Sequence, residues 1–253
     1  MPRLMPTDDT QAITIPGPGN FAFSAIKIEE LGATEYTLWT FVLDVSGSVS
    51  PFKDELLACI KATVGACQKH PRAENILYRL LLFNQDIVEV HGFKNLGDID
   101  VDKDYDALAP DGMTALFDAT YDAVGATVEF GKRLVEQDFD VNGIVCICTD
   151  GMDNRSSLTP NEIKKKIDSA LAKEEIESLL TILVALHDPQ LDWSDEVQHA
   201  LSKFEADADL SQFLDIGDAT PENLAKLANF VSESVSSQSN ALGSGAPSQT
   251  LTF

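Results

Sequence analysis

The sequence predicts an α/β protein with a Rossmann-like, doubly wound and mainly parallel central sheet, which has one antiparallel edge strand and helices on both faces. Apolar runs of strand length alternate with segments of helical periodicity along most of the chain. Several of the strand-like runs are almost continuously apolar, as expected for strands covered by helices on both faces. With 253 residues and 44% hydrophobic content, the chain is long enough for one large domain of this class.

The alternation begins with a strand and the helix that follows it. Residues 36–44 (YTLWTFVLD) are nearly all apolar and predict a buried strand. Residues 51–69 carry apolar side chains every three to four positions, which predicts an amphipathic helix. Ser50 is the expected cap of this helix, and Pro51 suits its first position.

A hairpin and an acidic loop are expected next. Residues 75–85 and 87–93 are two strand-like runs with a short polar turn between them, so one of them is expected to run antiparallel to the sheet. Residues 94–113 form an acidic loop, and a long helix is expected over about 115–138.

The second half continues the alternation of strands and helices. The expected strands are 143–150, 178–186 and 212–217, and the expected helices are 160–175, 193–203 and 221–235. Thr159 with Pro160, and Thr220 with Pro221, provide a cap and a first position for two of these helices.

Three regions follow from composition. Residues 1–34 contain four prolines and several glycines and are expected to form an extended arm or the start of a β-ribbon, with a possible short strand in FAFSAIKIEE. Residues 35–236 form the α/β domain. Residues 237–253 are rich in Ser, Gly and Pro and are expected to form a flexible tail.

The charge balance restricts the partners. There are 41 acidic and 18 basic residues, for a net charge of −23, which disfavours nucleic acid and anionic membranes. The N-terminus lacks a signal-peptide core, and no apolar run approaches the ~20 residues of a membrane span. Four cysteines lack zinc-site spacing and are expected to be packing residues in a reducing, cytoplasmic protein.

Oxygen-bearing side chains follow two of the expected strands. Asp44, Ser46 and Ser48 come at the end of the first strand in FVLDVSGSV, and Asp150 ends another in VCICTDGMDN. Thr114 precedes the long helix. Ligands of open α/β sheets bind beyond the carboxyl ends of the strands, so these five side chains are expected to meet there. All are hard oxygen donors, which suit Mg²⁺ or Mn²⁺. Two carboxylates balance the charge of a dication, while neutral hydroxyls leave it electrophilic.

These motifs resemble those of von Willebrand factor A domains. DVSGS matches the D-x-S-x-S motif of that family, and Thr114 and TDG at 149–151 match the other two parts of its metal-ion-dependent adhesion site, in the family's order. The resemblance covers about residues 35–235. It implies a sheet of about six strands and a metal site in which the three hydroxyls of Ser46, Ser48 and Thr114 contact the metal. Asp44 and Asp150 would bind it directly or through water. Thr120 is an alternative to Thr114 in the alignment.

The resemblance also implies a function. Such a site leaves a coordination position open for an Asp or Glu of a partner protein, which indicates a non-catalytic interaction module. Within the family, the chain looks most like compact bacterial and phage proteins of the tellurite-resistance TerY type. Those members imply an intracellular stress-response, defence or regulatory complex with a kinase, phosphatase or ATPase partner.

Two other functions stay open at the level of sequence. A strand that ends in an aspartate is also found in phosphatases that form an aspartyl phosphate, so the chain could be a Mg²⁺-dependent phosphohydrolase or phosphotransferase. Those enzymes usually carry a second acid two positions later, where this chain has Ser46, a poor proton relay at neutral pH. Alternatively, the metal could be purely structural in a scaffold protein whose arm or tail makes the contact.

Overall fold

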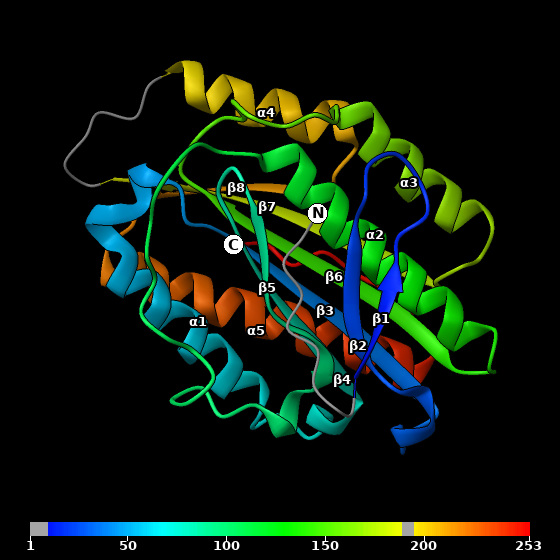
Figure 1. The fold of residues 1–253 in the computed structure, drawn as a ribbon. Helices are drawn as coiled ribbons and strands as arrows, with labels where there is room; N and C mark the ends of the chain where they lie inside the picture. The colour runs from blue at the N-terminus through cyan, green and yellow to red at the C-terminus, as the bar shows by residue number, and fades with distance from the viewer. Residues whose placement is uncertain (1–9, 189–194) are drawn as a thin grey trace.

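The computed structural model describes residues 10–188 and 195–253, which form one eight-stranded sheet with helices on both faces (Figure 1). The strands are β1 (Thr10–Thr14), β2 (Ala22–Ile26), β3 (Glu35–Asp44), β4 (Ile76–Phe83), β5 (Ile87–Asn95), β6 (Asp140–Thr149), β7 (Ser178–His187) and β8 (Gln212–Asp218). The helices are α1 (Lys53–Cys67), α2 (Leu116–Val135), α3 (Pro160–Ala172), α4 (Asp195–Ala208) and α5 (Pro221–Ser244).

The sheet is mainly parallel, as predicted. Its order is β1-β2-β5-β4-β3-β6-β7-β8, and strands β4, β3, β6, β7 and β8 pair in parallel. Strand β5 forms the predicted antiparallel hairpin with β4. It is not the last strand, because β2 pairs in parallel with β5, and β1 pairs antiparallel with β2. The fold is of the von Willebrand factor A type, with the sheet extended by β1 and β2.

Two apolar layers enclose the sheet. Helices α2, α3 and α4 cover one face, and α1 and α5 pack side by side on the other (Figure 1). The four cysteines are reduced and buried in the layer below α1 and α5, as the packing interpretation predicts. Burial raises the pKa of Cys59 and of Cys67 to about 12, so both thiols stay protonated at neutral pH.

The helix after β3 begins later than predicted. The residues after Asp44 first form a short 3-10 helix, Gly47–Phe52, which contains Pro51, and α1 starts only at Lys53. Ser50 therefore does not cap the α-helix. Ser46 precedes this 3-10 turn and Ser48 lies within it, so both serines stay near the strand end.

The region expected to be an extended arm or the start of a β-ribbon contains two paired strands. Within residues 10–34, β1 and β2 form a hairpin that joins the sheet edge, and Ile13 and Phe23 enter the core. The Pro/Gly cluster that suggested an arm is the hairpin loop, where Ile15 N–H donates to the Phe21 carbonyl at 3.0 Å. Gly19 has a φ of +82° in this loop, a conformation that favours glycine. Residues 1–9 of the predicted arm lie outside the described residues.

The C-terminal region also differs from the sequence prediction. Helix α5 continues to Ser244, nine residues beyond its predicted end, and the buried Gln238 accepts a hydrogen bond from Asn142 Nδ2 through its carbonyl at 2.8 Å. The residues after the helix dock through the Leu251 carbonyl, which accepts from Gln212 Nε2 at 3.0 Å. Serines have low intrinsic helix propensity, but the packing of this helix against the sheet overrides it.

A buried ion cluster ties β4, β5 and α2 together. Arg79 Nε donates to Glu89 Oε2 at 2.7 Å, and Arg79 Nη2 lies 2.8 Å from Asp122 Oδ1. All three side chains are fully buried. Ser24 on β2 donates to Glu89 Oε1 through its amide at 3.0 Å and its hydroxyl at 2.5 Å. The cluster therefore joins the added hairpin to the rest of the sheet.

A buried histidine anchors the acidic loop. His91 Nδ1 donates to the Gly92 carbonyl at 3.0 Å, so Nε2 is the acceptor for the Tyr105 hydroxyl at 3.1 Å. Burial is the main cause that lowers the pKa of His91 to about 4. Protonation would place a buried charge there and remove the acceptor for Tyr105.

Acid is therefore expected to destabilise the fold through His91. The pKa of His91 is depressed from 6.5 to about 4 on folding, so the unfolded chain binds the proton more readily. Stability is full above pH 6.5 and falls as the pH drops toward 4, by about 3 kcal/mol. Urea unfolding between pH 7.5 and 4 measures the free energy of unfolding of the wild type and of His91→Gln. The variant keeps the other titrating groups, so the wild type should lose about 3 kcal/mol more than the variant does. Parallel pH profiles of the two proteins would contradict this assignment.

Candidate metal site

The site begins where β3 and β6 end side by side. Asp44 is the last residue of β3, and its neighbour Leu43 pairs with Cys148 on β6, so Thr149 and Asp150 lie beside the aspartate. Asp44 is fully buried and both of its carboxylate oxygens accept hydrogen bonds. The Ser46 amide donates to Oδ1 at 2.8 Å, and the Thr149 hydroxyl donates to Oδ2 at 2.6 Å. The carboxylate is therefore held in one orientation.

The two serine hydroxyls connect this strand end to the second carboxylate. Ser48 Oγ donates to Asp150 Oδ1 at 2.9 Å, and Ser46 Oγ lies 3.2 Å from Ser48 Oγ. A hydroxyl has one proton, so Ser48 gives its proton to Asp150 and Ser46 gives its own to Ser48. Both serines keep oxygen lone pairs that can bind a cation. Ser48 is exposed and Asp150 half-buried, so the cluster opens to solvent.

Thr114 reaches the same place from the loop before α2. Its hydroxyl lies 4.0 Å from the position that a Cβ would take at Gly151, next to Asp150. The loop is fixed to the serine segment, because the Gly47 amide donates to the Gly112 carbonyl at 3.3 Å. Gly112 has a φ of +82°, which a side chain would strain. The structure thus brings all five predicted side chains to one edge of the sheet.

The alternative residue Thr120 lies away from this edge. It is fully buried in α2, and its hydroxyl donates to the Leu116 carbonyl at 2.8 Å, one turn earlier in the helix. That hydroxyl satisfies its own helix rather than facing the carboxylates. Between the two aligned threonines, the geometry favours Thr114.

Three residues that position the site were missed or undervalued in the sequence. Thr149 holds Asp44, and only its place before Asp150 in the TDG motif hinted at this contact. Asn154 and Thr114 exchange two hydrogen bonds, Thr114 N–H to Asn154 Oδ1 at 2.8 Å and Asn154 N–H to the Thr114 carbonyl at 3.0 Å. Asp153 accepts from the Phe117 amide at 3.3 Å, at the start of α2. Asp153 and Asn154 thus fix the loop that carries Thr114.

The two carboxylates lie in an unfavourable electrostatic environment. Burial raises the pKa of Asp44, although hydrogen bonds from Thr149 and Ser46 oppose it. Burial first and the charge of Asp44 second raise the pKa of Asp150 to about 7. No lysine, arginine or histidine of the described residues forms an ion pair with either group. A cation at this edge would compensate both charges.

The donor set fits a hard divalent cation. Within residues 10–188 and 195–253, no three His, Cys, Asp or Glu side chains come together in a way that could hold a metal ion. A metal here would therefore need the hydroxyls of Ser46, Ser48 and Thr114 beside the two carboxylates. Such an all-oxygen set suits Mg²⁺ or Mn²⁺, and it contains no soft ligand. When bound, the ion would act as a Lewis acid toward an incoming oxygen anion.

The same geometry disfavours an aspartyl phosphate at Asp44. The side chain has no exposed surface, and both oxygens are engaged by Ser46 and Thr149. A nucleophilic carboxylate needs one oxygen free to approach the phosphorus atom of an external substrate. Ser46, at the position of the usual acid/base, lies 2% exposed beside it. These contacts orient Asp44 and leave it poorly placed for attack.

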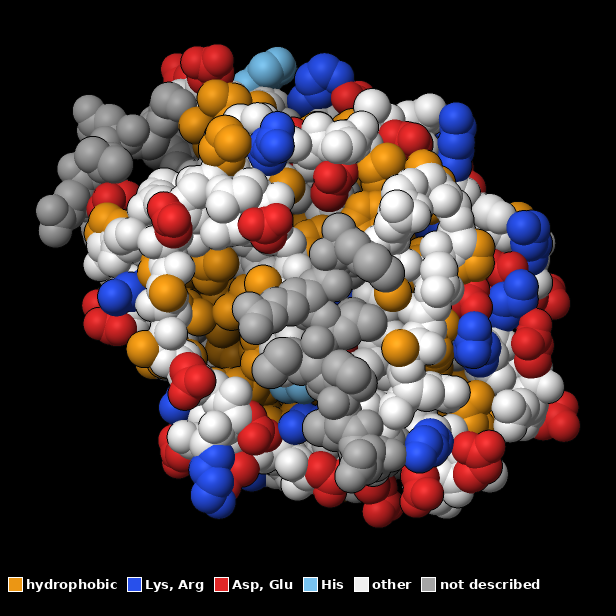
Figure 2. Space-filling view, viewed as in Figure 1, with side chains coloured by type: hydrophobic (Ala, Val, Ile, Leu, Met, Phe, Trp, Pro, Cys, Tyr) orange, Lys and Arg blue, Asp and Glu red, His pale blue; other side chains and the backbone are white. Residues whose placement is uncertain are grey.

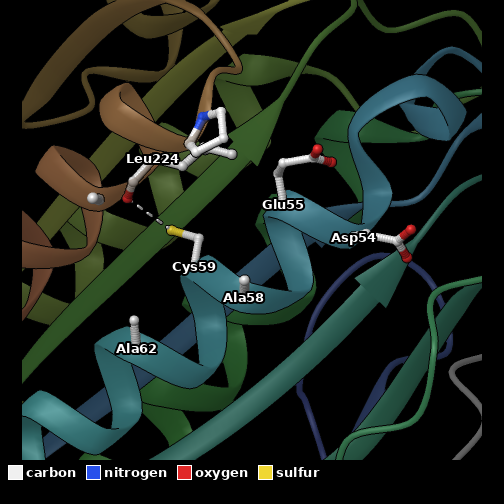
Figure 3. Close-up of a pocket in the computed structure, with 8 residues that line it drawn as sticks. Asp54, Glu55, Ala58, Cys59, Ala62 and Leu224 are labelled. Atoms are coloured by element: carbon white, nitrogen blue, oxygen red, sulfur yellow. Dashed lines mark hydrogen bonds between the residues drawn. The ribbon is translucent and has the colours of Figure 1, made fainter.

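The pocket between α1 and α5 does not contribute to this site. It has a volume of about 420 Å³ and is lined by residues of the two helices, among them Ala58, Cys59 and Leu224 (Figure 3). Cys59 is its one nucleophile, and the thiol donates to the Leu224 carbonyl at 3.3 Å. With its pKa raised to about 12, it has no thiolate chemistry near neutral pH.

Comparisons with known proteins show the fold. No protein-family profile and no curated protein sequence matches the chain. Among solved structures, the PilB minor pilin from Streptococcus sanguinis is similar over 92% of this chain and 68% of its own, with a TM-score of 0.56 and 14% identity. Proximal thread matrix protein 1 from the mussel byssus is similar over 80% of this chain (TM-score 0.50, 18% identity). The pilus adhesin SpaC from Lactobacillus rhamnosus GG is similar over 90% (TM-score 0.50, 12% identity).

The chain spans 47% of the mussel protein and 33% of SpaC. At these identities the likeness establishes the fold and not the partner or the metal. Within the described residues no helix combines the length and apolar character needed to cross a membrane.

Proposed function

We propose that this protein is a non-catalytic interaction module in which Asp44, Ser46, Ser48, Thr114 and Asp150 hold Mg²⁺, or Mn²⁺ in its place. The ion accepts an Asp or Glu carboxylate from a partner protein. The contact that carries the proposal is the hydrogen-bonded chain from Ser46 through Ser48 to Asp150, which joins two strand ends into one oxygen cluster at 3.2 and 2.9 Å.

The chemistry of the cluster favours an anionic ligand. Two carboxylates and a dication sum to zero charge, while the three hydroxyls donate little electron density, so the ion stays electrophilic. Mg²⁺ prefers six oxygen ligands and keeps positions for water or for ligands from outside. A carboxylate that replaces such a water gains the full attraction of the ion. The metal would thus turn an acidic surface into a receptor for an acid.

The rim of the cluster has the character of a contact surface. Four large hydrophobic side chains of the described residues are exposed, and two of these, Met113 at 46% and Met152 at 36%, directly adjoin Thr114 and Gly151. Methionine is flexible and polarizable, and it adapts to the shape of a partner. An exposed apolar pair around an anion receptor favours protein binding over binding of a free anion.

Replacing both methionines should separate partner binding from metal binding. In Met113→Ser/Met152→Ser, partner-peptide affinity should fall about tenfold, because the apolar contact area beside the metal is lost. Mg²⁺ affinity should stay within about twofold, since neither side chain offers a hard oxygen ligand. Calorimetric titration with Mg²⁺ and with a bound peptide measures the two quantities. A loss of Mg²⁺ affinity would show that the methionines act on the metal site itself.

The proposed function is tested with a library of random peptides displayed on phage and selected on the wild-type chain in Mg²⁺. We expect the enriched peptides to share an Asp or Glu, and we expect binding to vanish in EDTA and to return with Mg²⁺. Changing that residue to Asn or Gln in the synthetic peptide should lower affinity at least about tenfold. Peptides that bind equally in EDTA, or without any acid, would contradict the metal-dependent contact.

The biological setting is part of the proposal and rests on the resemblance of the motifs alone. TerY-type members of the von Willebrand factor A family imply an intracellular bacterial or phage stress, defence or regulatory complex, with a kinase, phosphatase or ATPase as the partner.

A further inference from the structure

An apolar groove lies next to the metal site and takes no part in it. It has a volume of about 330 Å³ and lies between α1, the β4–β5 hairpin and the acidic loop. Figure 2 shows hydrophobic side chains gathered in a hollow on this face of the molecule. The aliphatic lining comes from residues Val45, Leu57, Ile60, Leu80, Leu82, Val88, Val90 and Leu108.

Part of this lining remains in contact with water. Leu57 on α1, Leu82 on β4, and Val88 and Val90 on β5 line the groove and are only partly buried. Several aliphatic side chains that share one concave surface can bury further area when a ligand covers them. The volume of about 330 Å³ is large enough for one or two large side chains.

The rim of the groove is acidic. Asp86 in the hairpin turn and Asp106 in the loop are exposed, and neither pairs with a cation of the described residues. Asp104, also at the rim, is different, because Lys94 Nζ lies 3.1 Å from its Oδ2. Two unneutralised carboxylates around an apolar floor complement a ligand that is apolar in its body and cationic at its end.

The groove is continuous with the edge that carries the metal site. Val45 lines the groove and directly follows Asp44, and its carbonyl accepts from the Asp111 amide at 3.0 Å. Asn84 also lines the groove, and its carbonyl accepts from the Ala115 amide, next to Thr114, at 2.8 Å. One peptide segment bound at this edge can therefore reach both places.

We propose that the groove binds the same partner segment that offers its acid to the metal, through an apolar side chain adjacent to a lysine or arginine. This inference rests on the proposed function and adds the identity of the partner's neighbouring residues. It also explains how an acidic chain can bind a partner through a carboxylate. A chain with a net charge of −23 repels acidic partners at long range, so a carboxylate ligand is better delivered by a segment that is otherwise basic.

The phage-displayed peptides selected on the wild-type chain in Mg²⁺ test the groove directly. We expect the enriched sequences to carry, besides the acid, a large apolar residue next to Lys or Arg. Affinity of one such synthetic peptide should fall about fivefold on Asp86→Asn/Asp106→Asn, which removes the rim charges. It should fall at least about tenfold on Leu57→Glu, which places a charge in the apolar floor.

A matched control removes the same number of exposed acids elsewhere. Asp54→Asn/Glu233→Gln lies outside the groove and should keep the affinity within about twofold. Circular dichroism and urea unfolding verify that each variant is folded. If Leu57→Glu does not fold, the substitutions of the exposed Asp86 and Asp106 still test the groove.

The outcomes separate the two proposals. Peptides enriched in an acid alone, or affinities that both groove variants leave unchanged, would overturn the groove and leave the metal contact standing. Peptides that need the groove but bind equally in EDTA would keep the groove and overturn the metal contact. Failure to enrich any peptide in Mg²⁺ would count against both.

Discussion

Asp44→Asn is expected to lower Mg²⁺ affinity at least about 100-fold and, in EDTA, to make the protein more stable than the wild type. The two effects have one cause. Asp44 is fully buried near Asp150, so its negative charge is unfavourable until a cation compensates it. Asparagine has the same shape, and its oxygen can still accept from the Ser46 amide. Its amide group replaces the acceptor of the Thr149 hydroxyl, which can donate to the Gly151 carbonyl instead. The variant removes the charge without removing the hydrogen bond that orders the loop.

The measurement is thermal unfolding with and without Mg²⁺. The wild type should gain stability as Mg²⁺ is added, because the ion binds only the folded chain. Asp44→Asn should start with a higher unfolding temperature than the wild type in EDTA and should not respond to Mg²⁺. Asp207→Asn, at an exposed site on α4, is the control and should respond as the wild type does. A variant that is destabilised in EDTA and still responds to Mg²⁺ would show that Asp44 has a structural role only.

Arg79→Met is expected to destabilise the fold by about 3–5 kcal/mol. The substitution leaves Glu89 and Asp122, both fully buried, without their cation. Without Arg79, the desolvation penalty of the two buried carboxylates is no longer offset by attraction to a cation. Urea unfolding at pH 7.5 measures the loss.

Two variants sharpen this prediction. Lys203→Met removes the cation of an exposed pair with Asp207 and should cost less than about 1 kcal/mol. The triple variant Arg79→Met/Glu89→Gln/Asp122→Asn removes all three charges and should recover a large part of the loss. If Arg79→Met is as stable as Lys203→Met, the buried ion cluster does not stabilise the contact between the β1–β2 hairpin and the rest of the sheet.

Much of the site could be predicted because its parts follow strand ends. Asp44, Ser46 and Ser48 are close in sequence, and Asp150 follows a second parallel strand, so the sheet topology alone brings them to one edge. Thr114 was harder to assign, since a loop residue and a helix residue both matched. The structure separates them by hydrogen bonding, with the Thr120 hydroxyl used inside α2.

Contacts between distant polar residues could not be predicted from the sequence. Arg79 interrupts an apolar run, but the sequence does not indicate which residues pair with it. Asp122 lies on a helix 43 positions later. For the hairpin of β1 and β2, the sequence left an arm and a β-ribbon open, because the strands are short and the Pro/Gly loop is typical of both. Likewise, the last turns of α5 are rich in serine and are stabilised by packing that only the folded chain provides.

The most direct test of the metal site is Mn²⁺ binding followed by the loss of the free-ion signal in electron paramagnetic resonance. We expect the wild-type chain to bind one Mn²⁺ that Mg²⁺ displaces. Thr120→Val should bind as the wild type does, Thr114→Val should bind more weakly, and Asp44→Asn/Asp150→Asn should not bind measurably. If the double aspartate variant binds Mn²⁺ as tightly as the wild type, the five residues do not form the metal site.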